Sequence, residues 1–430
     1  MALPYDQIQG FILRGYTHPR ARHFMINMPA TAAGKKFLAA VTPMITTAAP
    51  WTQKPPTLLN IGLTADGLSQ LGIDVKNAGL GAEFVEGAIV RGFNYQSDNY
   101  NLGDTGDSAP NKWILGLGSG RVHAVLSLYA LDPHTRDQAS AKLMAMCIEA
   151  GVVSLGAQDS DDILGDSRVH FGYHDGISQP NIDGAPPRDH ANDQPIVATG
   201  EFVLGYNAEG GAFRGGPSFD PANGTYSAFR ILEQDVDAFY RYLAWAASEY
   251  DLPQEVIQAK FCGRWADGTP LVLSPDVQTG QPVNDFFYRK APPDPPDNPA
   301  RSCPIASHIR RSQRRDEDSQ AHRILRRAFP YGPPYAPSDG KERGLTGHFI
   351  CSSLQQQYEF IITQWVNGNT IDANARDPLL GDVDDAHPPT FSMYWKGTKK
   401  KLQKFGRFTS TRGGAYCYLP SISGLQTLAK

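Results

Sequence analysis

The chain is 430 residues long, which is enough for two or three domains around a large buried core. Apolar residues make up 41% of the chain and charged residues 20%, as in an ordinary globular protein. The 40 Lys and Arg against 44 Asp and Glu give a formal charge of −4, which argues against nucleic-acid binding as the main role.

The cysteines indicate neither a zinc or iron–sulfur site nor a disulfide framework, because they are odd in number and contain no CxxC motif. They are Cys147, Cys262, Cys303, Cys351 and Cys417. The N-terminal residues 1–16 have no apolar run long enough for a signal peptide, and no window of the sequence could span a membrane. We therefore expect a cytoplasmic location without membrane contact; a trimmed export signal would leave the same sequence.

The first half of the chain alternates predicted strands with predicted helices. The strands are expected at 21–28, 57–63 and 122–130, and the helices at 35–44, at 65–71 and from 133 onward. Asp132 and Pro133 are typical of a helix N-cap and a first helical residue, and Gly151 ends the same helix. The stretch 92–112, rich in Asn, Asp and Gly, predicts an irregular surface loop.

The second half repeats this scheme. Strands are expected at 225–231, 347–352 and 415–419, each followed by a helix, at 236–247, 354–365 and 422–428. Two sets of strand–helix units with short strands indicate an α+β protein with two similar halves. The Gly-rich run 205–217 predicts the boundary between them. A long insertion at about 250–345, with the Pro-rich run 291–300, interrupts the second half.

Residues 171–180 read FGYHDGISQP. Asp175 and Gly176 are typical of a tight turn after a strand end, and Pro180 cannot continue a helix. Taken alone, an Asp-Gly pair is usually no more than a turn.

This segment resembles the GxxDG signature of dye-decolorising peroxidases, a family of haem enzymes. Further segments resemble the same family in the same order: YDQIQGFILRGY at 5–16, EFVLGY at 201–206, CPIASHIRR at 303–311, ILRRAFPYG at 324–332 and GGAYCYLPSIS at 413–423. The resemblance implies an α+β fold with two ferredoxin-like domains of the dimeric α+β barrel type, with antiparallel sheets and helices. It implies an N-terminal domain at 1–215 with the GxxDG motif and a C-terminal haem-binding domain at 216–430.

A lone histidine beside a basic run is more often a surface residue, and the chain has 11 histidines. Within CPIASHIRR, the resemblance implies that His308 is the axial ligand of the haem iron. One imidazole nitrogen would bind iron while the other donates its proton to an acceptor that fixes the tautomer. A carboxylate acceptor would favour the high-valent state of the iron. Asp382, Asp384 and Asp385 are candidates, and the sequence does not choose among them.

Arg326 and Arg327 are adjacent, and without their flanking residues such a pair is about as often bonded to surface acids as it is part of a functional site. Within ILRRAFPYG, the resemblance implies that Arg326 lies over the haem. A guanidinium there stabilises the negative charge that develops as the O–O bond of peroxide breaks. The resemblance gives Asp175 the proton transfer between the two peroxide oxygens. Because the reference pKa of an aspartate is about 3.9, we expect an acidic optimum for dye oxidation.

The resemblance also implies contacts with the haem. Among the arginines of 310–315, Arg315 is the expected partner of a propionate. His348 and Phe349, in GHFICSS, resemble residues of a strand that lines the distal pocket. Bulky dyes cannot reach a buried haem edge, so we expect a surface electron relay. Tyr331 is the first candidate, because Pro and Gly beside it indicate an exposed loop; Trp365 is weaker, because it falls on the apolar stripe of its helix.

The resemblance thus implies a haem peroxidase that uses hydrogen peroxide to oxidise aromatic dyes, phenols and similar donors through a high-valent iron-oxo intermediate. The expected cofactor is haem b (iron protoporphyrin IX). The expected partners are hydrogen peroxide and aromatic small molecules, without nucleic acid or membrane; the sequence is compatible with an oligomer. The alternative is a haem-transfer or iron-recovery protein with incidental peroxidase activity. Such a carrier needs only His308, so the presence of Asp175 and Arg326 favours the enzyme. A chlorite-decomposing relative, which would not need Asp175, ranks third.

Overall fold

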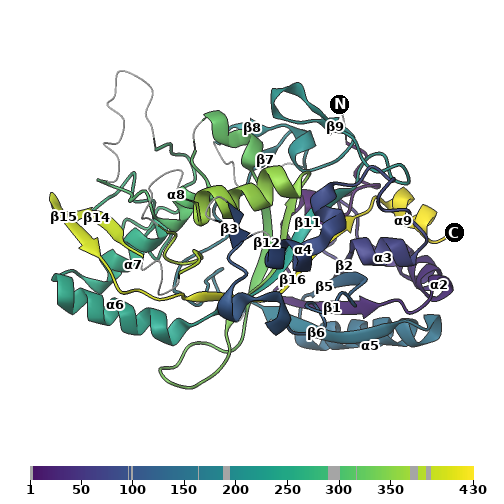
Figure 1. Cartoon of the computed structure of the whole chain (residues 1–430), viewed down its shortest axis with the longest axis horizontal. Helices are drawn as coiled ribbons and strands as arrows, with labels where there is room; N and C mark the ends of the chain where they lie inside the picture. The colour runs from purple at the N-terminus through teal and green to yellow at the C-terminus, as the bar shows by residue number, and fades with distance from the viewer. Residues whose placement is uncertain are drawn as a thin grey trace.

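One antiparallel sheet of eight strands, in the order β12-β13-β11-β16-β2-β5-β1-β6, runs through the centre of the molecule (Figure 1). The structure is a computed structural model. It describes all residues except 1–2, 95, 98–99, 163, 187–193, 289–300, 316, 369–375 and 384–388. In this described part, no helix is long and apolar enough to cross a membrane.

The first half has the ferredoxin-like strand order. Its strands are β1 (Arg20–Asn27), β2 (Thr57–Leu63), β5 (Ala124–Ala130) and β6 (Val153–Asp161), in the order β2-β5-β1-β6. Helix α2 (Thr31–Val41) follows β1, and α5 (Pro133–Ala150) follows β5. Asp132 caps α5 by accepting a hydrogen bond from the Thr135 amide at 2.9 Å, and Gly151 ends it in the left-handed conformation, as predicted.

The second half repeats this order. Its strands are β11 (Thr225–Gln234), β12 (Leu325–Tyr331), β13 (Gly344–Cys351) and β16 (Thr409–Leu419), in the order β12-β13-β11-β16. Between β11 and β12, the described residues form three α-helices: α6 (Val236–Tyr250), α7 (Gln254–Cys262) and α8 (His308–Ser312). After β13 come the π-helical turns η7 (Leu354–Glu359) and η8 (Ile361–Val366). The prediction of two ferredoxin-like halves is confirmed.

The two halves share one core. A single residue pair, Tyr418 with Leu63, joins β16 to β2 at the centre of the sheet. The edge strands β6 and β12 lie against each other, so the sheet curves into a barrel. One cluster of buried apolar residues extends through both halves. The boundary between 1–215 and 216–430 remains a prediction.

A chain of buried histidines and serines crosses the barrel. Ser127 Oγ lies 2.9 Å from His23 Nδ1 and 2.9 Å from His348 Nε2. Ser227 Oγ lies 3.0 Å from the other ring nitrogen of His348, and Ser160 Oγ lies 3.4 Å from His23 Nε2. Burial lowers the pKa of His23 to about 4 and holds that of His348 well below its ordinary value. Both histidines are therefore neutral parts of the core.

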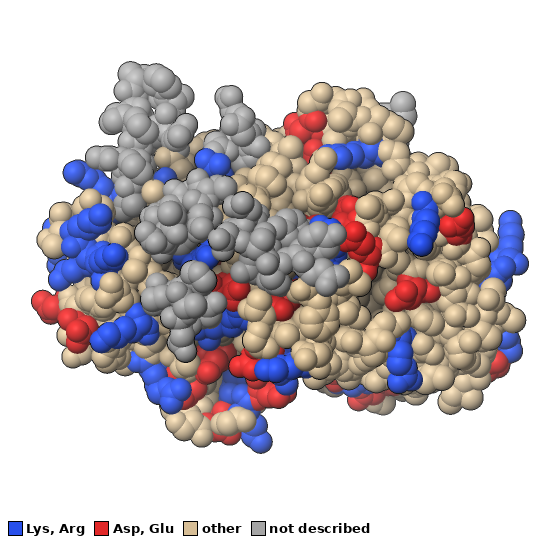
Figure 2. Space-filling model, in the orientation of Figure 1, with Lys and Arg blue, Asp and Glu red and all other residues tan. Residues whose placement is uncertain are grey.

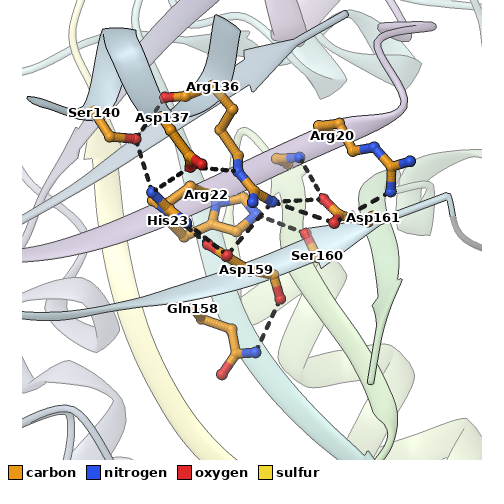
Figure 3. A network of polar contacts seen from close by, with 11 residues as sticks. Arg20, Arg22, His23, Arg136, Asp137, Ser140, Gln158, Asp159, Ser160 and Asp161 are labelled. Atoms are coloured by element: carbon orange, nitrogen blue, oxygen red, sulfur yellow. Dashed lines mark hydrogen bonds and ion pairs between the residues drawn. The ribbon is translucent and has the colours of Figure 1, made fainter. Parts of the chain in front are cut away.

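An ion-pair network joins the edge of the first half to α5 (Figure 3). Arg22 on β1 pairs with Asp159 on β6 at 2.5 Å and with Asp137 on α5 at 3.2 Å. Arg136 lies 3.1 Å from Asp161, which also pairs with Arg20. The network contains as many arginines as aspartates and fixes β6 against α5.

The remaining elements surround the barrel. They are α1 (Gly10–Leu13), α3 (Ala65–Gln70), α4 (Ala82–Asn94), α9 (Ile422–Leu428), β3 (Gln96–Ser97), β4 (Tyr100–Asn101), β7 (Asn181–Ile182), β8 (Ile196–Val197), β9 (Tyr206–Asn207), β10 (Phe213–Arg214), β14 (Phe391–Trp395), β15 (Thr398–Leu402) and the short turns η1 (Thr42–Met44), η2 (Gly106–Ser108), η3 (Pro110–Lys112), η4 (Thr199–Glu201), η5 (Glu209–Gly211) and η6 (Glu317–His322). Figure 1 shows α6, α7, β14 and β15 at one end of the molecule, and α2, α3 and α9 at the other. Helix α4, which packs against β16, was not predicted, and its end takes up the start of the expected loop at 92–112.

Candidate active site

Asp175 lies on a tight turn between the two halves. The Asp175 amide donates to the Ser167 carbonyl at 2.9 Å, and the Val169 amide donates to the Tyr173 carbonyl at 3.0 Å. Gly176 has φ 80°, a left-handed conformation that favours glycine and turns the chain away directly after the carboxylate. The predicted Asp-Gly turn is confirmed.

Arg326, on β12, faces this turn. Its Nη1 donates to Asp175 Oδ1 at 2.9 Å, and its Nη2 donates to the Ser178 carbonyl at 3.2 Å. The Gln179 side chain holds the backbone of Arg326 on both sides: its Nε2 donates to the Arg326 carbonyl at 3.1 Å, and its Oε1 accepts from the Arg326 amide at 3.3 Å. Ser178 and Gln179, which follow the Asp-Gly turn, thus fix the arginine opposite the aspartate.

His308 begins α8, and its ring is held by a buried acid. His308 Nδ1 lies 2.7 Å from Asp377 Oδ2, and the Asp377 side chain is fully buried. The second carboxylate oxygen of Asp377 accepts from the Leu379 amide at 2.8 Å and the Leu380 amide at 3.1 Å. Burial acts to lower the pKa of His308, but the Asp377 carboxylate outweighs it and the net shift is upward. This carboxylate leaves Nε2 as the ring nitrogen that can bind a metal.

The acidic partner of His308 is therefore outside the three predicted candidates. Asp382 pairs instead with Arg407 and accepts from Thr105 Oγ1 at 2.9 Å. Asp384 and Asp385 lie outside the described residues. The sequence did carry one signal for Asp377: the following residue is Pro378, and an Asp-Pro pair is typical of a capped turn such as the one its carboxylate makes.

His308, Asp175 and Arg326 belong to one site. The charges of Arg326 and Asp175 both act on the titration of His308, and His308 in turn acts on that of Asp175. Burial acts to raise the pKa of Asp175, but the Arg326 guanidinium and a hydrogen bond from the Gly176 amide outweigh it, so the pKa lies below its ordinary value. The carboxyl group is therefore ionised at neutral pH and can accept a proton.

Phe349 and His348 were expected to line the same pocket, but they lie on opposite faces of β13. Phe349 pairs with Arg326 across the β12–β13 ladder, and His348 pairs with Arg327. Because side chains alternate along a strand, Phe349 shares the face of Arg326. His348 points into the barrel, where both its ring nitrogens contact serines. The structure thus disagrees with the placement of His348 at the pocket.

Two buried arginines near this site have no acidic partner among the described residues. The Arg315 and Arg264 guanidinium carbons lie 3.8 Å and 5.2 Å from the centre of the Phe286 ring. Arg315 donates to the carbonyls of Asn284 and Phe286 at 2.8 and 3.1 Å, yet its Nε and the Arg264 Nη2 have no partner. Burial lowers the pKa of Arg315 to about 10. Two uncompensated buried cations suit a ligand with carboxylates.

Neither relay candidate lies in an exposed loop. Tyr331 is the last residue of β12, is half-buried, and its ring lies over Gly344. Burial raises its pKa. Trp365 is 4% exposed and packs its ring edge against Phe360. The expectation of an exposed loop at Tyr331 was wrong, and Trp365 is a core residue.

Comparisons with known proteins point to one family. Residues 258–381, which contain His308, Arg326 and Asp377, match a family model described as "Dyp-type peroxidase, C-terminal". A dye-decolorizing peroxidase of Exidia glandulosa is 28% identical over 99% of this chain and 87% of its own. The multifunctional dye peroxidase DyP2 of Amycolatopsis sp. is 25% identical over 98% of this chain and 95% of its own.

Solved structures agree. The crystal structure of a fungal DyP-type peroxidase from Auricularia auricula-judae superposes with a TM-score of 0.85 at 24% identity, and covers 100% of both chains. A dye-decolorizing peroxidase in complex with 2,6-dimethoxyphenol gives a TM-score of 0.84 at 25% identity, also over 100% of both chains. The family match over the site, the relatives along almost the whole length and the shared fold show that the chain is similar to DyP-type peroxidases.

Proposed function

We propose that the protein is a dye-decolorising peroxidase, a haem enzyme that uses hydrogen peroxide to oxidise aromatic dyes, phenols and similar small molecules. The observation that carries this proposal is the meeting of Asp175 and Arg326 at 2.9 Å beside His308, since these three residues come from segments far apart in the sequence. The similarity to this family implies the haem cofactor; its identity as haem b is part of the proposal.

The residues present fit such a group. His308 would be the axial ligand through Nε2, with Asp377 fixing the ring and its tautomer. Arg315 would meet a propionate, together with Arg264, which nothing in the sequence singled out. The unpartnered Nε of Arg315 and Nη2 of Arg264 are the observation that supports this fit, because buried cations need negative charge. A bound haem would supply the iron at which peroxide is reduced and donors are oxidised.

Asp175 and Arg326 would handle the proton and the charge. The ionised Asp175 carboxylate accepts a proton from one oxygen of hydrogen peroxide and returns it to the departing oxygen, which leaves as water. Arg326 donates a hydrogen bond to that carboxylate through Nη1. Its guanidinium is protonated at every working pH, so it stabilises the negative charge that develops in the peroxide. Phe349, on the same face of β13, would form an apolar wall beside them.

The depressed pKa of Asp175 supports the proposed acidic optimum. The group stays ionised, and so able to accept a proton, at pH values at which a distal histidine would already be protonated. The pH dependence of dye oxidation tests this proposal; a neutral or alkaline optimum would count against it.

A haem-transfer protein is the alternative, and the Asp175–Arg326 pair argues against it because a carrier does not need proton transfer. The test is to add peroxide to the haem-loaded protein. A peroxidase loses Soret intensity rapidly and recovers it when a phenol is added, repeatedly and with product formed. A carrier bleaches without recovery. The expected cytoplasmic location remains a prediction that cell fractionation tests.

A further inference from the structure

The end of the molecule formed by α6, β14 and β15 carries an unusual concentration of positive charge. Residues 396–404 read KGTKKKLQK, with five lysines and no acid, in a chain whose formal charge is −4. Figure 2 shows Lys and Arg side chains gathered at this end, over the position that β14 and β15 have in Figure 1. The basic run is therefore a surface patch and not a charge run spread around the protein.

Hydrogen bonds fix this segment against α6. Tyr242 OH donates to the Gln403 carbonyl at 3.0 Å, and the Gln403 amide donates to Tyr250 OH at 3.1 Å. Lys400 Nζ donates to the Tyr250 carbonyl at 2.9 Å. Both backbone groups of Gln403 are thus held by tyrosines of α6, which sets the position of the next residue, Lys404.

Lys404 is held in a strained conformation over an exposed aromatic ring. Its φ is 62°, a left-handed value that non-glycine residues rarely adopt. Its ammonium group lies 5.6 Å from the centre of the Trp245 ring, and Trp245 is 37% exposed. The two side chains line a surface hollow of about 350 Å³ together with Arg241 and Tyr242. A volume of this order holds one small aromatic molecule.

The hollow keeps a net positive charge. Arg241 pairs with Asp237 at 3.3 Å, so its charge is partly compensated, and Glu249 lies about two turns further along α6 than Arg241. Lys399 and Lys401 face the opposite side of β15 from Lys400, which contacts α6, so they do not line the hollow. In the described part of the chain, the cations that line it are Arg241 and Lys404, and the Lys404 ammonium has neither an ion pair nor a hydrogen bond. These cations are available to a ligand.

We propose that this hollow binds a small anionic aromatic molecule, an aryl sulfonate or aryl carboxylate. The Trp245 face would stack on the ligand ring, while Lys404 and Arg241 would hold its anionic groups. Such a role would explain the left-handed backbone at Lys404, which Tyr242 and Tyr250 hold in place. This backbone conformation puts the Lys404 ammonium beside the Trp245 ring. That the ligand is an electron donor rests on the proposed peroxidase function; its binding does not.

The first test uses the full haem-loaded protein without peroxide. Naphthalene disulfonate, which is not readily oxidised, is titrated while tryptophan fluorescence or binding heat is followed. We expect saturable binding that weakens as NaCl is raised, and much weaker binding of the neutral naphthyl methanol. Equal binding of both compounds would overturn the proposal. The proposal would also be overturned if the protein bound a polyanion such as heparin but did not bind the disulfonate.

Single-residue variants test whether binding depends on Lys404 itself or only on the overall positive charge of the surface. Lys404→Gln should weaken disulfonate binding roughly fivefold or more, since it removes one cation at the ring. The matched control Lys76→Gln, an exposed lysine after α3, should leave binding unchanged. Lys404→Gly should relax the left-handed backbone, so its melting temperature should not fall even though binding weakens. Unchanged binding in both Lys404 variants would refute the site.

A kinetic comparison distinguishes failure of this inference from failure of the proposed function. With peroxide, Lys404→Gln should raise KM for a sulfonated dye and leave KM for a neutral phenol and kcat for both unchanged. If the phenol is oxidised but the dye KM does not move, the docking site is refuted while the peroxidase assignment stands. If neither donor is oxidised by wild type, the peroxidase assignment fails, and the titration without peroxide still decides the binding site.

Discussion

Arg326 Nη1 lies 2.9 Å from Asp175 Oδ1, although 151 positions separate the two residues along the chain. The contact crosses from a turn after the first ferredoxin-like half to an edge strand of the second. It is fixed by Gln179, which binds the backbone of Arg326 on both sides. The site therefore depends on the packing of the two halves and not on either alone.

Asp175→Asn should keep haem but lose most of its reaction with peroxide. The amide has nearly the shape of the carboxylate and can still contact Arg326, but it cannot accept a proton. The rate constant for reaction with peroxide should fall by about two to four orders of magnitude. Stopped-flow spectra of the haem-loaded variant measure it. A rate within a few-fold of wild type would contradict the role of Asp175.

Arg326→Leu should move the acid limit of the peroxide reaction to higher pH. In wild type, Arg326 lowers the pKa of Asp175, so the carboxylate stays ionised below its ordinary pKa of 3.8. Without the guanidinium, only the Gly176 amide and His308 still oppose burial, so the pKa rises and Asp175 becomes protonated and inactive at a higher pH. The pH profile of the peroxide reaction should shift its acidic limb upward. A limb that stays in place or moves lower would show that Asp175 does not govern it.

Asp377→Asn should loosen the hold on His308. The variant replaces a charged acceptor at 2.7 Å from Nδ1 by a neutral amide, so the ring becomes a weaker electron donor. We expect haem affinity to fall about 10- to 100-fold and the reduction potential of the bound haem to rise. Haem titration and spectroelectrochemistry measure the two quantities. An unchanged potential would argue against a role for Asp377 in setting the ligand strength of His308.

Two aspartate variants should differ sharply in stability. Asp104 accepts from Arg230 at 2.9 Å and both side chains are almost fully buried, so Asp104→Asn strands a buried charge and should cost about 3–5 kcal/mol. Asp159 also pairs with an arginine, Arg22, but its side chain is 42% exposed (Figure 3). Asp159→Asn should therefore cost about 1 kcal/mol or less, and less again at high salt. Urea denaturation compares the two; equal losses would contradict the burial argument.

The buried histidines should make the fold less stable as the pH falls. His23 has a pKa of about 4 in the folded protein and about 6.5 when unfolded, so the unfolded chain takes up a proton between these values. The contribution of neutral His23 to the unfolding free energy is complete above about pH 6.5. It is lost as the pH falls towards the pKa of the folded state, at about 1.4 kcal/mol per pH unit.

Urea denaturation from neutral pH down to about pH 4.5 tests this linkage. His23→Gln should reduce the dependence of the unfolding free energy on pH, while the same change at the exposed His134 should not alter it as much. The slope, and not the absolute stability of the variant, is the quantity to compare. An unchanged slope in His23→Gln would mean that His23 is protonated in the folded barrel.

Local signals in the sequence predicted much of the fold. Strand β2 and helix α9 have the predicted bounds, because β2 is a run of apolar strand formers and Ser421 caps α9. Strands β6 and β12 were missed, although they form the two edges of the sheet. Most of β6 is only half-buried, and β12 contains two arginines and a proline, so neither shows the apolar alternation by which strands are recognised.

The site was predictable where residues stand in recognisable segments. His308, Arg326 and Asp175 each lie in such a segment, and the structure brings them together. Asp377 was not found because its contact with His308 spans 69 positions and follows no periodicity. His348 was misplaced because adjacent residues on a strand face opposite sides, and which of the two faces the pocket depends on the register with β12.

In the proposed site, His308 holds a haem that faces Asp175 and Arg326. The most direct test of this arrangement is the absorption spectrum of wild type, His308→Ala and Asp175→Asn after reconstitution with haemin, before and after peroxide. We expect a Soret band in wild type that responds to peroxide at once, a band lost or strongly shifted in His308→Ala, and a normal band with a slow response in Asp175→Asn. A wild-type protein that binds no haemin, or a His308→Ala spectrum identical to wild type, would contradict this arrangement.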